Sequence, residues 1–179
     1  MKKSLGPTPL AIPAPVWLIG SYDGDGRPNA MAASWAGICC SEPPCVAVAV
    51  RPERYSHAAI AMRGAFTVSV PSARHVAGVD VMGTASGRDG DKFAAAGLTP
   101  IRSNVVDAPY VSECPVVLEC RVRESLDLGS HTLFVGQILD VKADPEVLGE
   151  DGALDVSAID PFVLLRGYHA LGRPLRRVP

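Results

Sequence analysis

The chain has 179 residues, 47% hydrophobic and 20% charged, and its formal net charge is −2. This size and balance predict one globular domain over residues 1–179, with residues 1–14 as an extended N-terminal arm. The absence of a long basic block argues against nucleic acid as a partner.

The sequence also gives an expectation about membranes and location. No apolar run approaches the roughly 20 residues that cross a bilayer, so no membrane partner is expected. The N-terminal segment is interrupted by four prolines within its first 15 residues and has no continuous apolar stretch. It therefore does not resemble a secretory signal, and the expected location is the cytoplasm.

The five cysteines are Cys39, Cys40, Cys45, Cys114 and Cys120. Their number is odd, no C-x-x-C occurs, and the spacing does not match a zinc site. We expect free thiols in a reducing compartment and no bound metal. A remote alternative is a redox or metal protein that uses the first three cysteines, which bound metal or a thiol titration linked to activity would favour.

Strand-like segments separated by turn residues run along the chain. The expected strands cover residues 16–22, 28–37, 45–51, 65–70, 116–123, 132–141 and 162–165. The sequence Asp-Gly-Asp-Gly over 23–26 predicts a hairpin turn between the first two, because glycine supplies the positive φ that such turns need.

The clearest strand signal is the alternation over residues 116–123. Val116, Leu118, Cys120 and Val122 occupy one face of the expected strand. The opposite, half-polar face carries Val117, Glu119, Arg121 and Arg123. This period of two is typical of a strand with one face toward the core.

Three short helices are expected among these strands. They cover residues 56–62 and 72–82, with Ser56 and Ser72 as N-caps, and residues 91–96, closed by Gly97. Hairpin connections outnumber helical crossovers. We therefore predict a mainly β fold, an antiparallel barrel or sandwich with a few short peripheral helices.

Residues 28–37 read Pro-Asn-Ala-Met-Ala-Ala-Ser-Trp-Ala-Gly, a strand-like segment built from small side chains. Small residues let a flat ligand approach the backbone and its hydrogen-bonding groups. A polar-edged aromatic ring system such as a flavin fits this description. A tightly packed Ala-rich strand explains the same segment equally well.

Two further segments combine cations, hydroxyls and the start of an expected helix. They are residues 51–57 (RPERYSH) and 85–93 (ASGRDGDKF). Free N–H groups and arginine side chains at such places favour an anion. The alternatives are a surface helix with solvated arginines and a polar turn. Neither a Walker A loop nor a G-x-G-x-x-G pattern is present.

Residues 129–136 (GSHTLFVG) place His131 beside a turn at the start of a strand, where a surface role is the alternative to a functional one. No G-x-S-x-G or H-E-x-x-H occurs, and nothing assembles a catalytic triad. An enzyme without these groups can leave the difficult chemistry to a cofactor.

Taken together and in order, these segments carry a family resemblance. The matching stretches are 15–23 (PVWLIGSYD), 26–37 (GRPNAMAASWAG), 41–44 (SEPP), 86–93 (SGRDGDKF), 118–120 (LEC) and 129–136 (GSHTLFVG). The chain resembles the flavoredoxin branch of the flavin reductase-like family, whose fold is an antiparallel Greek-key FMN-binding split β-barrel.

The resemblance implies a homodimer with one FMN per subunit, and it implies the residues that bind it. Met31, Ala32 and Ala33 would line the isoalloxazine, and Asn29, Ser34 and Trp35 would hold the flavin and its ribityl chain. Near the phosphate the resemblance places Arg51, Ser56, His57, Ser86 and Lys92. His131 would lie near the nicotinamide of NADH or NADPH; Ser130 here stands where related reductases have Asp.

Two functions follow from the resemblance. The first is an NAD(P)H-dependent FMN reductase that passes electrons through FMN to free flavin, a ferric chelate or a protein, with His131 positioning the nicotinamide. The second is a non-enzymatic electron carrier of the flavoredoxin type, with tightly bound FMN.

Overall fold

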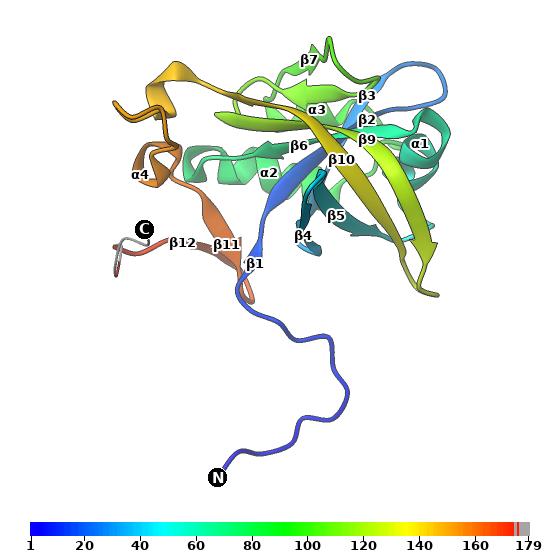
Figure 1. The fold of residues 1–179 in the computed structure, drawn as a ribbon. Coiled ribbons are helices and arrows are strands. Elements are labelled where there is room, and N and C mark those ends of the chain that lie inside the picture. Colours follow the sequence, from blue (N-terminus) through cyan, green and yellow to red (C-terminus); the bar gives the residue numbers. More distant parts are fainter. Residues whose placement is uncertain (174, 176–179) are drawn as a thin grey trace.

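The structure is a computed structural model that describes residues 1–173 and 175. Residues 174 and 176–179 of the expected domain lie outside the described residues. Antiparallel strands form the body of the molecule, and the helices are short and peripheral (Figure 1). This agrees with the predicted mainly β class.

One seven-stranded sheet dominates the fold, in the order β3-β2-β6-β9-β10-β5-β4 with every neighbouring pair antiparallel. Its strands are β2 (Trp17–Tyr22), β3 (Pro28–Ala33), β4 (Ala36–Ser41), β5 (Pro44–Val50), β6 (Ala65–Val70), β9 (Val116–Asp127) and β10 (Thr132–Ala143). Both strands of the β9–β10 hairpin extend further than predicted. β9 continues to Asp127 rather than residue 123, and β10 continues to Ala143 rather than residue 141.

The two edge strands of this sheet, β3 and β4, are consecutive in the chain and are joined only by Ser34 and Trp35. The prediction of one strand over 28–37 is therefore wrong, because the chain bends at these two residues. Since a two-residue link joins both edges, the sheet is rolled up. Ala33 of β3 and Val46 of β5 accordingly share one buried core cluster.

Four α-helices and two 3-10 turns surround the sheet in the described chain. They are α1 (Tyr55–Arg63), η1 (Ala73–His75), α2 (Val76–Thr84), α3 (Lys92–Ala96), η2 (Pro145–Val147) and α4 (Val156–Ile159). Ile60 of α1 is buried in the core of the rolled sheet. The helices α2 and α3 pack through Val79 and Phe93 against Leu18 and Ala30, on the other face of β2 and β3. No helix among the described residues is long and apolar enough to cross a membrane.

Two predicted helix starts need correction. Helix α1 begins at Tyr55, and its N-cap is Arg54 without a side-chain cap. Ser56 instead uses its hydroxyl to accept a hydrogen bond from Asn29, 2.8 Å away. The segment predicted as one helix over 72–82 is split into η1 and α2, and Ser72 caps neither with its side chain. The hydroxyl of Ser56 is used in a tertiary hydrogen bond with Asn29, and neither serine caps a helix with its side chain.

Five short strands among the described residues form two small sheets, and of these the sequence predicted only β11, as residues 162–165. They are β1 (Ala14–Pro15) with β11 (Phe162–Leu164) and β12 (Tyr168–Ala170), and β7 (Pro100–Arg102) with β8 (Pro109–Val111). Residues 1–13 precede β1, are exposed and form no strand or helix. Figure 1 shows this segment running away from the body of the sheet.

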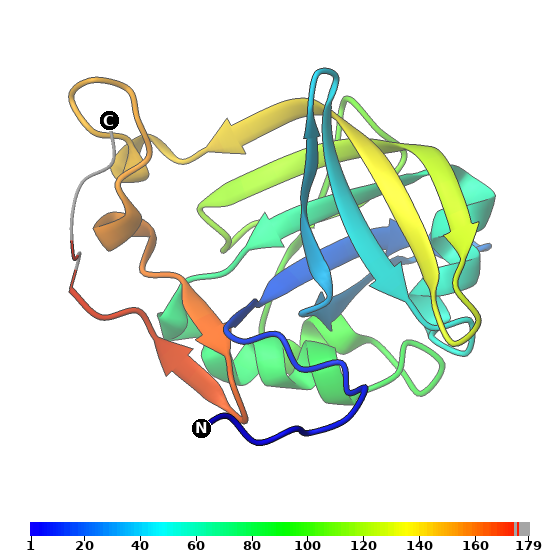
Figure 2. The same ribbon diagram turned by 60° about the horizontal axis from the view of Figure 1, so that its bottom comes forward.

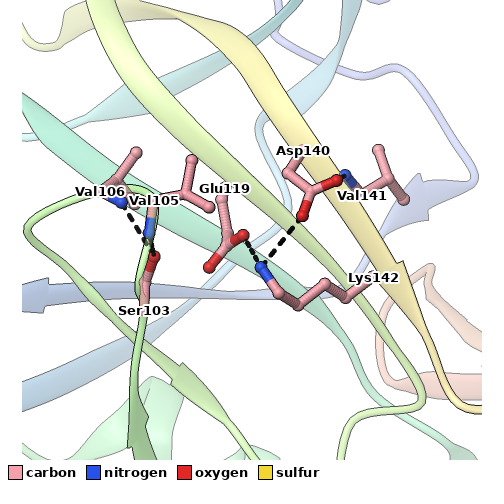
Figure 3. A network of polar contacts seen from close by, with 7 residues as sticks. All are labelled: Ser103, Val105, Val106, Glu119, Asp140, Val141 and Lys142. Carbon is pink, nitrogen blue, oxygen red and sulfur yellow. Dashed lines mark hydrogen bonds and ion pairs between the residues drawn. The ribbon is translucent and has the colours of Figure 1, made fainter.

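A polar network on β9 and β10 lies beside the loop between β7 and β8 (Figure 3). Glu119 is completely buried, and its Oε2 pairs with Lys142 Nζ. Lys142 also pairs with Asp140 at 3.1 Å. Glu119 Oε1 has no hydrogen-bond partner. The carboxylate expected on the half-polar face is thus inside the protein, and Lys142 balances its charge.

Candidate functional site

A cavity of about 400 Å³ lies where β3, the 34–35 link, the start of α1 and the end of α2 meet. Its wall comes from four separate stretches of chain, within 29–35, 49–56 and 82–92 and at residue 131. The rolled sheet brings the first two stretches together, and the packing of α2 and α3 on β3 adds the third.

Every predicted site residue except His57 lines this cavity. The predicted residues in its wall are Asn29, Met31, Ala32, Ala33, Ser34, Trp35, Arg51, Ser56, Ser86, Lys92 and His131. His57 lies outside the lining. Its Nε2 is 2.8 Å from the hydroxyl of Thr132, and its ring meets Phe134 edge-on at 5.3 Å between centroids. The structure therefore gives His57 a packing role between α1 and β10.

The wall also contains residues that the sequence did not single out as site residues. They are Ala49, Val50, Glu53, Arg54, Tyr55, Met82, Gly83, Thr84, Ala85, Gly87 and Arg88. Arg54, Gly87 and Arg88 belong to the two anion-favouring segments, so their composition offered a signal. The last turn of α2 carries no such signal, because only tertiary packing brings it to β3.

The floor of the cavity is an edge strand with small side chains. β3 pairs with β2 along one side only, so backbone N–H and C=O groups on its other side are not used in the sheet. Met31, Ala32 and Ala33 contribute to the cavity wall here. A flat ligand with polar edges can therefore reach free backbone groups at this strand.

Asn29 presents an unsatisfied acceptor in this region. The side chain is 4% exposed, and its amide nitrogen donates to Ser56 Oγ at 2.8 Å. Its Oδ1 has no partner. A buried acceptor without a donor costs about 1–3 kcal/mol, so a ligand hydroxyl or N–H that reaches it would be favoured.

Gly87 allows the loop before α3 to pack closely against the same place. A Cβ at this position would lie 2.5 Å from the Tyr55 ring and 2.7 Å from Asn29 Oδ1. Tyr55 is itself fixed by donating its hydroxyl to Asp23 at 2.7 Å. A side chain at position 87 would therefore disturb both Tyr55 and Asn29.

Lys92 brings a buried positive charge to the cavity. The residue is 6% exposed, and its ammonium donates to the carbonyls of Ala30 at 2.7 Å and Met82 at 2.8 Å. It has no acidic partner among the described ion pairs. Burial, helped by the nearby charge of Arg54, lowers the pKa of Lys92 to about 8. An ammonium has three donors, so one remains for an anion.

Arginines extend this positive charge toward the opening. Arg88 donates to the backbone carbonyl of Glu53 at 3.1 Å, and its guanidinium carbon lies 5.6 Å from the centre of the Tyr55 ring. Arg51 and Arg54 lie in the wall of the same cavity. These cations and Lys92 make this end of the cavity suitable for a phosphate group.

The other end of the cavity has an aromatic wall. The indole of Trp35 stacks on the imidazole of His131 with centroids 4.6 Å apart and planes 26° apart. The Oγ of Ser130 lies 2.9 Å from Nδ1 of His131 and helps to fix the ring. No group of three or more His, Cys, Asp or Glu side chains in the described chain is arranged to hold a metal.

Comparisons with known proteins assign the fold to a family. The flavin reductase like domain matches residues 10–169, so the chain belongs to the flavin reductase-like family. The structure of flavoredoxin from Desulfovibrio vulgaris (Miyazaki F) superposes with a TM-score of 0.93 and 47% identity, covering 99% of this chain and 97% of that one. The fold is thus an antiparallel split barrel, as the sequence predicted.

Two sequence relatives come from Archaeoglobus fulgidus. An uncharacterised protein is 39% identical over 115 residues, which are 64% of this chain and 65% of that protein, just under two thirds of its length. A ferric-chelate reductase (NAD(P)H) is 30% identical over 133 residues, which are 73% of this chain and 78% of that protein. This chain is therefore similar both to a protein named flavoredoxin and to a protein named ferric-chelate reductase.

Proposed function

We propose that this protein binds FMN in the cavity and acts as an oxidoreductase that passes electrons from NADH or NADPH through FMN to an acceptor. The observation that carries the proposal is the chemistry of the cavity wall. Small residues and free backbone groups line one part. At the other, Arg51, Arg54, Arg88 and Lys92 gather around a single carboxylate, Glu53, which pairs with Arg51 at 3.5 Å. A flat polar ring joined to a phosphate matches this division.

The residues present fit FMN on two observations. Asn29 Oδ1 is a buried acceptor without a donor, which a ribityl hydroxyl or a ring N–H would satisfy. Lys92 is a buried cation without a carboxylate, which a phosphate would balance. In the proposal, Met31 to Ala33 lie along the ring, and Ser34 and Trp35 complete its surroundings.

The phosphate is assigned to the cationic end of the cavity. Arg51, Ser56, Ser86 and Lys92 all lie in its wall. Arg54 joins this set as a third cation, and its charge acts on Lys92. His57 leaves it, because its ring is engaged with Thr132 and Phe134.

When bound, FMN supplies the chemistry of accepting a hydride and giving up electrons one or two at a time. The chain then has to position the donor rather than act as an acid or a base. His131 is held by Trp35 and Ser130 at the cavity wall, where it would orient the nicotinamide. Such positioning brings the reacting atoms to about 3–3.5 Å.

The proposal is tested on the purified protein in two steps. A flavin absorbance spectrum, with FMN in the supernatant after heating, is expected for the first. Anaerobic rapid mixing with NADH and NADPH is then expected to bleach the flavin band. A protein that neither contains nor takes up FMN would overturn the binding proposal, and FMN that no nucleotide bleaches would overturn the reductase.

A second candidate is a non-enzymatic carrier that exchanges electrons with another protein. The 47% identity to a flavoredoxin over nearly the whole chain favours it, as does Trp35, which lines the cavity and is 48% exposed. This function predicts reduction by a redox protein and not by free nucleotide, with slow release of FMN on dilution. Free flavin, ferric chelates and proteins are compared as acceptors in the same assay.

We also propose that the protein is a homodimer and that it works in the cytoplasm. Both proposals come from the family resemblance and from the sequence. Light scattering coupled to gel filtration measures the first, and a mass of one chain would contradict it. Fractionation of cells with an antibody to the protein measures the second.

A further inference from the structure

Three of the five cysteines meet at one irregularity in the β4–β5 hairpin. Ile38 pairs with Val46, and the next pair is Cys40 with Cys45, so the register shifts between them. The extra residue is Cys39. At such a bulge two residues of one strand oppose a single residue of the other, so Cys39 and Cys40 both lie opposite Cys45.

The spacing of Cys40 and Cys45 is that of a disulfide. Directly opposite residues in antiparallel strands have Cα atoms about 4.5–5.5 Å apart. Disulfides span Cα distances of about 4.4–6.8 Å. The two thiols are free in this structure. Their bond therefore requires side-chain rotation and a small local adjustment rather than a rearrangement of the strands.

The surroundings of these thiols make them reachable. Cys39 and Cys40 are exposed, and Cys45 is 2% exposed beneath them. β4 is an edge strand with one neighbour, and Figure 2 shows the tip of its hairpin projecting at the top of the view. An edge hairpin can open locally at low cost, which exposes the buried partner.

Cys40 is the member of the exposed pair whose register partner is Cys45. Its Sγ lies at the hairpin tip, 3.4 Å from the carbonyl oxygen of Glu42. Desolvation, with the nearby Cys45 and Cys40, raises the pKa of Cys39, so Cys39 forms less of the reactive thiolate than an unperturbed cysteine does. The remaining cysteines, Cys114 and Cys120, are buried away from solvent and are unreactive by access alone.

We propose that Cys40 and Cys45 form a reversible dithiol–disulfide site that reacts with small-molecule disulfides. The Cys40 thiolate attacks one sulfur of the small disulfide, whose S–S bond breaks and releases one thiolate that takes up a proton. Cys45 loses its proton and attacks the Cys40 sulfur, releasing the second small thiol. The protein pair is oxidised by two electrons, and the small disulfide is reduced to two thiols.

This site is independent of the FMN proposal, because neither cysteine lines the cavity. A metal is not part of it, since no three of the described thiols, imidazoles or carboxylates are arranged to bind one. Electrons come from the thiols and go to the added disulfide. No further reactant is needed.

The test treats the full-length protein with oxidised glutathione, quenches it by alkylation and analyses it by mass spectrometry. We expect two thiols to be lost without a retained glutathione, a peptide linked through Cys40 and Cys45, and full recovery with dithiothreitol. A wild-type protein that keeps all thiols, or that stops at the glutathione adduct, would overturn the proposal.

Single cysteine substitutions identify which two thiols form the disulfide. Cys45→Ser is expected to stop at a stable glutathione adduct on Cys40, and Cys39→Ser is expected to close the disulfide as the wild type does. Because Cys45 is buried, Cys40→Ser at an exposed position serves as a second variant that keeps the core unchanged. Loss of disulfide formation in Cys39→Ser, or its survival in Cys40→Ser, would assign the bond to other thiols and overturn the proposal.

Discussion

The imidazole of His131 lies stacked on the indole of Trp35, with ring centroids 4.6 Å apart, although the two residues are almost a hundred positions apart in the chain. Trp35 comes from the link between the two edge strands, and His131 precedes β10. The two rings contact each other in the wall of the cavity. The positioning role that we propose for His131 would therefore depend on the bend at Ser34 and Trp35.

Replacing His131 with alanine is expected to slow reduction by NADH or NADPH about tenfold, which corresponds to about 1.4 kcal/mol of lost positioning. The affinity for FMN should stay nearly unchanged, because the cationic end of the cavity is intact. Rapid mixing measures the first quantity and fluorescence titration the second. His75→Ala, at a half-buried position of η1 outside the cavity lining, is the control, and an equal effect of both variants would contradict the role.

Lys92→Met is expected to weaken FMN binding by about tenfold to a hundredfold, since a hydrogen bond to a charged group contributes about 1.5–3 kcal/mol. Riboflavin, which lacks the phosphate, should lose much less affinity. Titration of both ligands into the apoprotein measures the difference. Arg123→Met, on the exposed end of β9, is the matched loss of a cation. Equal weakening for FMN and riboflavin would place the phosphate elsewhere.

Lys92 also gives the apoprotein a dependence of stability on pH. Its pKa is about 8 in the folded protein and 10.5 when unperturbed. Between these values the unfolded chain binds more protons, so the free energy of unfolding should rise with pH across this window. Denaturant titrations at several pH values give the free energies of unfolding of the wild type and of Lys92→Met. Subtracting one from the other removes the contribution of the other titrating groups. A difference independent of pH would contradict the assignment.

Gly87→Ala is expected to weaken FMN binding at least several-fold, because the added Cβ would push Tyr55 and the acceptor of Asn29 out of place. Gly24→Ala is the control, since a Cβ there meets nothing within 4 Å and the residue has no positive φ. Thermal unfolding of both apoproteins separates misfolding from a local effect. Unchanged affinity in Gly87→Ala would show that this loop does not shape the site.

Lys142→Met is expected to destabilise the protein toward the lower end of the about 3–5 kcal/mol that breaking a buried ion pair costs, because Lys142 is itself 40% exposed. Asp140→Asn should cost less than about 1 kcal/mol, since that pair is exposed. Adding Glu119→Leu to Lys142→Met should recover much of the loss. Urea midpoints measure all three, and a single Lys142 variant as stable as wild type would contradict the network.

The alternation in β9 predicted its core face correctly, because Leu118, Cys120 and Val122 all contact the core of the rolled sheet. The opposite face was predicted less well. Glu119 is completely buried although its neighbours Arg121 and Arg123 are exposed. The strand β8 covers this face of the sheet. Thr67 of β6, which is paired with Glu119, donates its hydroxyl to the carbonyl of Pro109 in β8. An alternation with a period of two predicts which residues share a face of the strand. It does not predict which distant segment packs over that face.

The residues selected from the sequence, His57 excepted, line one cavity, but their arrangement in space could not be predicted from the sequence. Local composition drew attention to the segments that contain Asn29, Lys92 and His131, and the family resemblance selected these residues within them. Neither was enough for the last turn of α2, which joins the cavity only through packing on β3. His57 shows the converse, since its segment looked functional while its ring is used between α1 and β10. Such choices depend on tertiary contacts that no short window of sequence contains.

The walls of the cavity come from stretches that meet only when both edges of the sheet have been brought together at Ser34 and Trp35. A ligand that recognises this cavity therefore binds the complete fold and not the unfolded chain. Its binding energy adds to folding as RT ln(1 + [L]/Kd), about 2.7 kcal/mol at a hundredfold excess over Kd. The supply of flavin in the cell would then set how much of this chain survives proteolysis.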